Sequence, residues 1–240
     1  MIRRSPATMI MTDPIQLTDA AKHYEELPHQ VDAWDWLQDQ LTPSQLHWFG
    51  VLYRSAPAPA PAGTIIQDVP YFYQLDNRSG QGERECFSSS CAMLAAHFGK
   101  VKTDDEYNTR RRGYGPTTDA RAQVMTLQSY GLKPTYAQNW TAEMVKAEVK
   151  AGRPVAVGWL HHGPATAPRG GGHWSVIVGY DDEAQQWIHN DPNGEADLVA
   201  GAYVSNDIRR GVYVRYSYKN FDPRWTVAKP ADGWVMACSG

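Results

Sequence analysis

The second half of the chain alternates short apolar runs with turn-forming residues, a pattern typical of β-strands. Residues 154–160, 173–180 and 186–190 are rich in β-branched and aromatic side chains. Three acidic residues, 181–183, lie between the last two of these runs and predict a hairpin turn. Residues 211–217 alternate apolar and polar positions and predict a further strand. Together these segments predict an antiparallel sheet.

Helical spacing dominates the region before these strands. One helix is predicted to begin at Cys86 and to end at Gly99, because glycine readily takes the left-handed conformation that closes a helix. Two more helices are predicted over 119–130 and 142–151, and each is followed by a glycine. Helices that precede an antiparallel sheet indicate an α+β fold.

The composition changes abruptly at residues 56–63, where proline and alanine alternate. Such a segment is extended and predicts a linker between domains. Residues 1–55 have helical spacing and predict a small helical segment, either a cell-wall-binding unit or an accessory one. A segment this short forms a weak core alone, so it packs against the main domain, 64–240, or against a partner. Both arrangements remain open.

Charge and hydropathy exclude several classes of function. The net charge of −3 gives no argument for a nucleic-acid partner. The one short basic run, 110–112, predicts a solvated loop. No run of about eighteen apolar residues is present, so we expect no membrane insertion. The N-terminus lacks a signal-peptide core, and we expect synthesis in the cytoplasm of the host or source cell.

The chain has three cysteines, an odd number that argues against a disulfide framework. Cys91 lies five residues after Cys86 on the predicted helix, so the two side chains do not face each other. We expect Cys91 to be a small buried residue. Cys238 lies near the chain end, where chains often fray. Both are predicted to be inert.

Cys86 is the candidate nucleophile. A thiol attacks as the thiolate, which a helix N-terminus and a nearby imidazolium both stabilise. The unpaired amide groups of the same helix end can also stabilise a tetrahedral oxyanion. The alternative interpretation is a buried structural cysteine. The nucleophile is favoured because His173 and Asp191 follow Cys86 in the order that such a site requires.

His173 begins an apolar strand and is the candidate general base. His161 and His162 compete for this role, but only His173 precedes a hairpin that ends in an Asp-Pro pair. Asp191, at that position, is expected to accept the second ring proton of His173 and fix its tautomer. Asp191 also lies among turn-forming residues, and a turn role is compatible with the first.

A side-chain amide is the expected second donor of the oxyanion hole. Gln74 is the first candidate and Gln81 is the alternative. The sequence has no Cys-x-x-Cys and no His-Glu-x-x-His, so we predict no metal site and no other cofactor.

The order of these elements resembles the bacteriocin-processing-peptidase-like branch of papain-superfamily cysteine peptidases. The resemblance covers residues 64–240 and rests on the runs 69–77, 86–99, 152–155, 172–180 and 190–192. It implies a papain-like fold, with Cys86 as nucleophile, His173 as base, Asp191 as orienting residue and Gln74 as oxyanion donor. Further runs, 158–163 and 216–220, look like versions carried by tailed bacteriophages. We expect four residues of these motifs to contact substrate: Trp159, His161, His162 and Trp174.

The sequence thus predicts a cysteine peptidase that cleaves amide bonds through an acyl-enzyme on Cys86. The phage resemblance favours peptidoglycan as the substrate, as for an endolysin with endopeptidase or amidase activity that acts on the cell wall after release or as a virion component. One alternative is a protease that processes phage or host polypeptides. Another is a wall-binding or virion structural module without catalysis. The sequence leaves the oligomeric state and the bond cleaved open.

Overall fold

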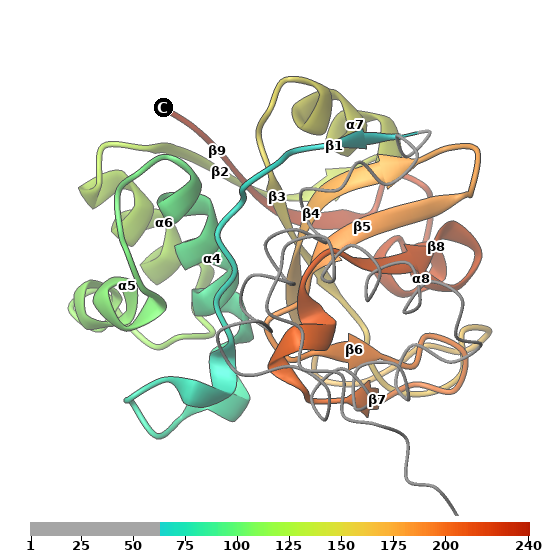
Figure 1. The fold of residues 1–240 in the computed structure, drawn as a ribbon, viewed down its shortest axis with the longest axis horizontal. Helices are drawn as coiled ribbons and strands as arrows, with labels where there is room; N and C mark the ends of the chain where they lie inside the picture. The colour runs from blue at the N-terminus through green and yellow to red at the C-terminus, as the bar shows by residue number, and fades with distance from the viewer. Residues whose placement is uncertain (1–62) are drawn as a thin grey trace, which may run out of the picture. The chain divides into compact units, whose positions relative to one another are not determined.

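A seven-stranded antiparallel sheet lies at the centre of residues 63–240, the part of the chain that the computed structural model describes (Figure 1). The strand order is β2-β9-β3-β4-β5-β8, and β1 also pairs with β4. The strands are β1 Thr64–Ile65, β2 Lys133–Trp140, β3 Val155–Trp159, β4 His173–Asp181, β5 Gln186–Asn190, β8 Val214–Ser217 and β9 Gly233–Ser239. A separate two-stranded sheet pairs β6, Glu195–Ala196, with β7, Tyr203–Ser205.

Five α-helices complete the described part of the fold. They are α4 Cys86–His97, α5 Asp104–Arg111, α6 Ala120–Ser129, α7 Ala142–Lys150 and α8 Tyr218–Trp225. Three short 3-10 helices are η1 Gln74–Asp76, η2 Gly82–Arg84 and η3 Ile208–Gly211. In Figure 1, α4, α5 and α6 gather on one side of the sheet and α8 lies on the other.

Side-chain alternation along β4 explains why helices cover both faces of the sheet. Trp174 points to the face of α4, where its ring stacks on that of Phe87 at 3.8 Å. Its neighbour His173 points to the opposite face, the side of Trp159 and α8. Strands covered on both faces read as continuous apolar runs, and β3 is buried throughout.

Helix α4 is the most enclosed element of the core. Its middle residues, Cys91 to Ala95, have no exposed surface. The buried hydroxyl groups of Ser88 and Ser89 are satisfied by Thr117 and Asp104. A helix enclosed in this way fixes its first residue, Cys86, at a defined point beside the sheet.

Most predicted elements are confirmed. Helix α6 lies within the predicted 119–130, and the Asp119 side chain caps it by accepting from the Arg121 amide. Helix α7 and strands β3, β4 and β5 agree with their predicted ranges to within a residue or two at each end. The last predicted strand begins later, at Val214, because Gly211 belongs to η3 and leaves no room for a side chain. A Cβ there would lie 2.1 Å from the Asp191 carbonyl oxygen.

Two predictions are wrong. The basic run 110–112 is no solvated loop, because Arg110 and Arg111 complete α5 and Arg111 is only 5% exposed. The chain end does not fray, since Cys238 lies in β9, opposite Pro134 of β2. Cys91 is buried, as predicted. The predictions for the helical segment 1–55, and for its linker up to residue 62, concern residues outside the described range.

Candidate active site

Cys86 is the first residue of α4 and its side chain is partly exposed. The amide groups of the first helical turn have no partner within the helix and point toward this end. The other two described cysteines, Cys91 and Cys238, are buried, and burial raises the pKa of each thiol. Cys86 is therefore the thiol within the described residues that a substrate can reach.

His173 contacts both of its predicted partners. Its Nε2 atom lies 2.8 Å from Oδ1 of Asp191, and Cys86 lies close enough to help raise the pKa of the ring. Because Nε2 faces Asp191, Nδ1 is left for the thiol. Burial alone would lower the pKa of His173, but the negative charge and hydrogen bond of Asp191, together with Cys86, raise it to about 10. The imidazole is therefore held as a cation beside the sulfur at neutral pH.

Asp191 follows the end of β5 and is completely buried. Its carboxylate accepts hydrogen bonds from the Tyr216 hydroxyl at 3.0 Å, from the Tyr203 hydroxyl at 3.3 Å and from the Asn193 amide at 3.0 Å. These donors satisfy the buried carboxylate and fix its orientation toward His173. The sequence analysis missed both tyrosines, which lie on strands that only the fold brings to this point.

Gln74 contacts both the loop that precedes Cys86 and the residue that follows Asp191. Its backbone amide donates to the Pro192 carbonyl, and its side-chain Nε2 donates to the Gly82 carbonyl, both at 2.9 Å. The side chain is buried, and its Nε2 has a second proton available for another acceptor. Gln81 is exposed, and its backbone amide donates to Oγ of Ser79. Of the two amides only that of Gln74 is buried, and its role as oxyanion donor stays a prediction.

The predicted substrate contacts fall into two groups. Trp159 is only 2% exposed, its indole N–H donates to Ser175, and its ring meets His173 edge-on at 5.2 Å. It therefore supports the histidine from beneath and offers little surface to a substrate. Trp174 is partly exposed but stacks on Phe87.

His161 also lies beside His173, and His162 lies against His161 with the ring centroids 3.9 Å apart. The His161 ring centroid is 6.0 Å from that of His173, and burial, followed by the positive charges of His173 and His162, lowers its pKa to about 4. His161 is therefore neutral at pH 7. His162 borders a pocket of about 390 Å³ whose other lining residues are small or basic: Gly163, Arg169, Gly170, Ala200, Gly201 and Ala202.

Residues 63–240 hold no group of three or more histidine, cysteine or acidic side chains that could bind a metal ion. In the same range, no helix has the length and apolar character needed to cross a bilayer.

Comparison with known protein families gives a match over most of the described residues. The model of the Peptidase_C39-like family matches residues 66–221, well over half of the chain. The chain belongs to this family. As a Peptidase_C39-like protein it is a cysteine peptidase, as the sequence analysis predicted. The phage subtype that the sequence suggested is not addressed by this match.

Two solved structures are similar to this chain at low sequence identity. One is a C39-like peptidase from Bacillus anthracis, with a TM-score of 0.53 and 16% identity, covering 74% of this chain and 98% of that one. Another is the peptidase domain of Streptococcus ComA, described as a bifunctional ABC transporter involved in quorum sensing. It has a TM-score of 0.46 and 16% identity, covering 71% and 98% of the two chains. No curated protein gave a significant match. The first of these similarities shows that the fold is that of papain-like peptidases, as predicted.

Proposed function

We propose that this peptidase cleaves amide bonds through an acyl-enzyme on Cys86. The observation that carries the proposal is the continuous chain of contacts from Cys86 to His173 to Asp191. The thiolate attacks the carbonyl carbon, and the C=O electron pair moves to oxygen. The His173 imidazolium then gives its proton to the leaving amine as the C–N bond breaks. Water, deprotonated by the neutral His173, attacks the thioester and releases Cys86.

The negative oxygen of each tetrahedral intermediate needs donors that are already in place. The amides at the start of α4 provide one set. The second Nε2 proton of Gln74 provides another, since the first is held by Gly82. Removal of one such donor typically costs on the order of 100-fold in rate.

For the substrate we propose the peptide stems of bacterial peptidoglycan, cleaved within the stem or at the amide that joins it to sugar. The sequence motifs shared with phage versions support this assignment. So does the pocket beside His162, because Arg169 there can pair with the free carboxylates that stem peptides carry. Trp234, which is 45% exposed, adds an aromatic surface of the kind that binds sugars and peptides.

The test is digestion of purified peptidoglycan by the wild type and by Cys86→Ala, with the released fragments weighed by mass spectrometry. The proposal predicts that the wild type releases stem peptides with new amino groups and that the variant releases none. Equal release by both proteins would refute the role of Cys86. Release of fragments from a polypeptide such as casein, with no release from the wall, would favour the protease alternative.

A further inference from the structure

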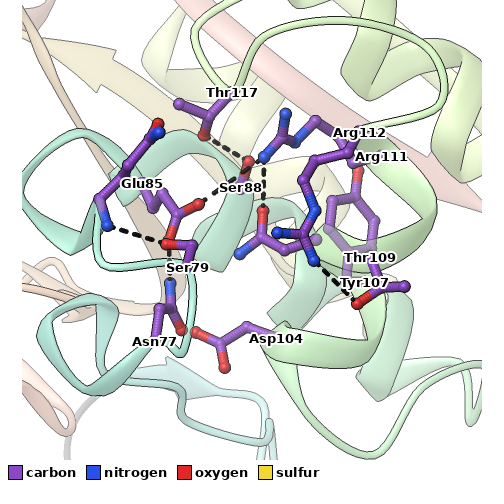
Figure 2. Close-up of polar contacts among 12 residues, drawn as sticks. Asn77, Ser79, Glu85, Ser88, Asp104, Tyr107, Thr109, Arg111, Arg112 and Thr117 are labelled. Carbon is purple, nitrogen blue, oxygen red and sulfur yellow. Dashed lines mark hydrogen bonds and ion pairs between the residues drawn. The ribbon is translucent and has the colours of Figure 1, made fainter.

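The carboxylate directly before the nucleophile has an unusual set of partners. Glu85 is the N-cap residue of α4, yet its side chain accepts no hydrogen bond from the helix. Instead its Oε2 accepts from Nδ2 of Asn77 at 2.9 Å and from Oγ of Ser79 at 2.7 Å, as Figure 2 shows. Glu85 is only 1% exposed. Its carboxylate therefore ties the preceding loop to the residue that adjoins Cys86.

A buried arginine pairs with this carboxylate. Nη2 of Arg111, from α5, lies 3.7 Å from Oε1 of Glu85 (Figure 2). Arg111 is itself held by the Asn108 side chain at 3.2 Å and by the Gly115 carbonyl at 2.7 Å. A buried carboxylate without a partner would be strongly unfavourable, and Arg111 supplies that partner.

The loop tied by Glu85 is the one that places Gln74. The Gly82 carbonyl accepts from Nε2 of Gln74 and from the backbone amide of Glu85. Asn77 makes a second contact with the helix through Oγ of Ser89, at 3.2 Å. The position of the Gln74 amide therefore depends on a loop whose buried side-chain contacts converge on Glu85.

We infer that Glu85 is a positioning residue for the oxyanion hole, acting through the loop of Asn77, Ser79 and Gly82 without touching substrate. This inference rests on the proposed roles of Cys86 and Gln74. The negative charge beside Cys86 opposes a thiolate, so its effect on the sulfur alone would be unfavourable. The role of Glu85 is therefore to hold the loop. Loss of its charge should weaken a reaction that needs the oxyanion hole, and should leave unchanged or speed up a reaction of the sulfur that does not need it.

The experiment compares one reaction that needs the oxyanion hole with one that does not. Iodoacetamide alkylates the thiolate by displacing iodide and forms no oxyanion. The aldehyde N-acetyl-glycyl-glycinal adds the thiolate at its carbonyl carbon, and the C=O electron pair moves to an oxygen in the oxyanion position, which takes a proton from the His173 imidazolium. Both probes are independent of the natural substrate, so the outcome stands whether or not peptidoglycan is cleaved.

We expect Glu85→Gln to weaken aldehyde binding by about tenfold while alkylation at pH 6 stays equal or becomes faster. The matched control is Glu83→Gln, which removes the same charge from an exposed residue two positions earlier and should change neither value more than about twofold. Ser79→Ala removes one hydrogen bond to Glu85 but keeps the buried ion pair. It should weaken aldehyde binding in the same direction, with unchanged thermal unfolding.

Two results would overturn the inference. Equal losses in alkylation and aldehyde binding in Glu85→Gln would mean that Glu85 acts on the thiolate or on the whole helix. Unchanged aldehyde binding in Glu85→Gln would mean that the loop keeps its place without the carboxylate. Failure of the proposed nucleophile is a separate finding, since Cys86→Ala would then bind the aldehyde as tightly as the wild type does.

Discussion

Replacement of Asp191 by asparagine should lower the pKa of His173 by several units. The substitution keeps the size of the side chain and removes its charge. In the wild type, burial opposes a charged imidazole, and Asp191, with Cys86, overcomes it to raise the pKa from 6.5 to about 10. This rise corresponds to about 5 kcal/mol of interaction favouring the cation, at about 1.4 kcal/mol per pKa unit. Without the carboxylate, burial acts with only Cys86 to oppose it, and we expect the pKa to fall below about 7.

Proton linkage fixes the sign of the stability change. Because the folded-state pKa of His173 is raised, its contribution to the free energy of unfolding is complete below about pH 6.5 and is lost as the pH rises to about 10. The wild type should therefore lose stability across this window, and Asp191→Asn should lose much less. The difference in this pH dependence between the two proteins reports on His173, because the other titrating groups are common to both.

Two measurements check this prediction. Histidine C2–H NMR titration gives the pKa directly, with the His173 signal assigned by its absence in His173→Gln. Urea unfolding at several pH values gives the stability window. A wild-type His173 that titrates near 6.5, or a pKa that Asp191→Asn shifts by less than one unit, would refute the electrostatic argument.

Three further outcomes are expected. Burial raises the pKa of Asp104 to about 6, so Asp104→Asn should raise the free energy of unfolding at pH 7 by about 2 kcal/mol, with the gain shrinking toward pH 4, as urea unfolding would show. Trp174→Ala removes the stack on Phe87 and should lower stability by about 3 kcal/mol in the same assay, whereas an unchanged midpoint would contradict the role of the stack. Iodoacetamide at pH 7 should label Cys86 alone within the described residues, and peptide mass mapping that finds Cys91 labelled equally would refute its burial.

The core of the site was predictable because its signals are local. Cys86 and His173 each begin a secondary-structure element, and Asp191 follows the end of one, so element ends and chain order were enough to select them. Their assigned roles stay predictions until the variants are measured. Glu85 and Arg111 could not be linked from sequence, because their contact depends on how two helices pack.

The partners of Asp191 were also beyond the sequence. Tyr216 lies on β8 and reaches Asp191 only because β8 pairs with β5. Tyr203 lies on the small β6–β7 sheet, whose two-residue strand β6 has no distinct pattern. Such contacts depend on which strands become neighbours in the sheet, and the apolar pattern of a single strand does not identify its neighbour.

Helix α5 was missed although the sequence holds its start signal. Its residues are strongly polar, so no apolar face indicated a helix. Thr103 and Glu106 nevertheless have the spacing of a capping box, and the Thr103 side chain accepts from the Glu106 amide. Strand β9 was missed for another reason, because apolar residues at a chain end were interpreted as a frayed terminus.

The hydrogen bonds around Asp191 have a consequence for a variant that lacks the His173 side chain. The two tyrosine hydroxyls and the Asn193 amide hold the carboxylate without help from the ring. Truncation of His173 to glycine would therefore leave a ready-made receptor for free imidazole, with its orienting acceptor already aligned and Trp159 as one wall. The protein would then become an enzyme that an added small molecule switches on.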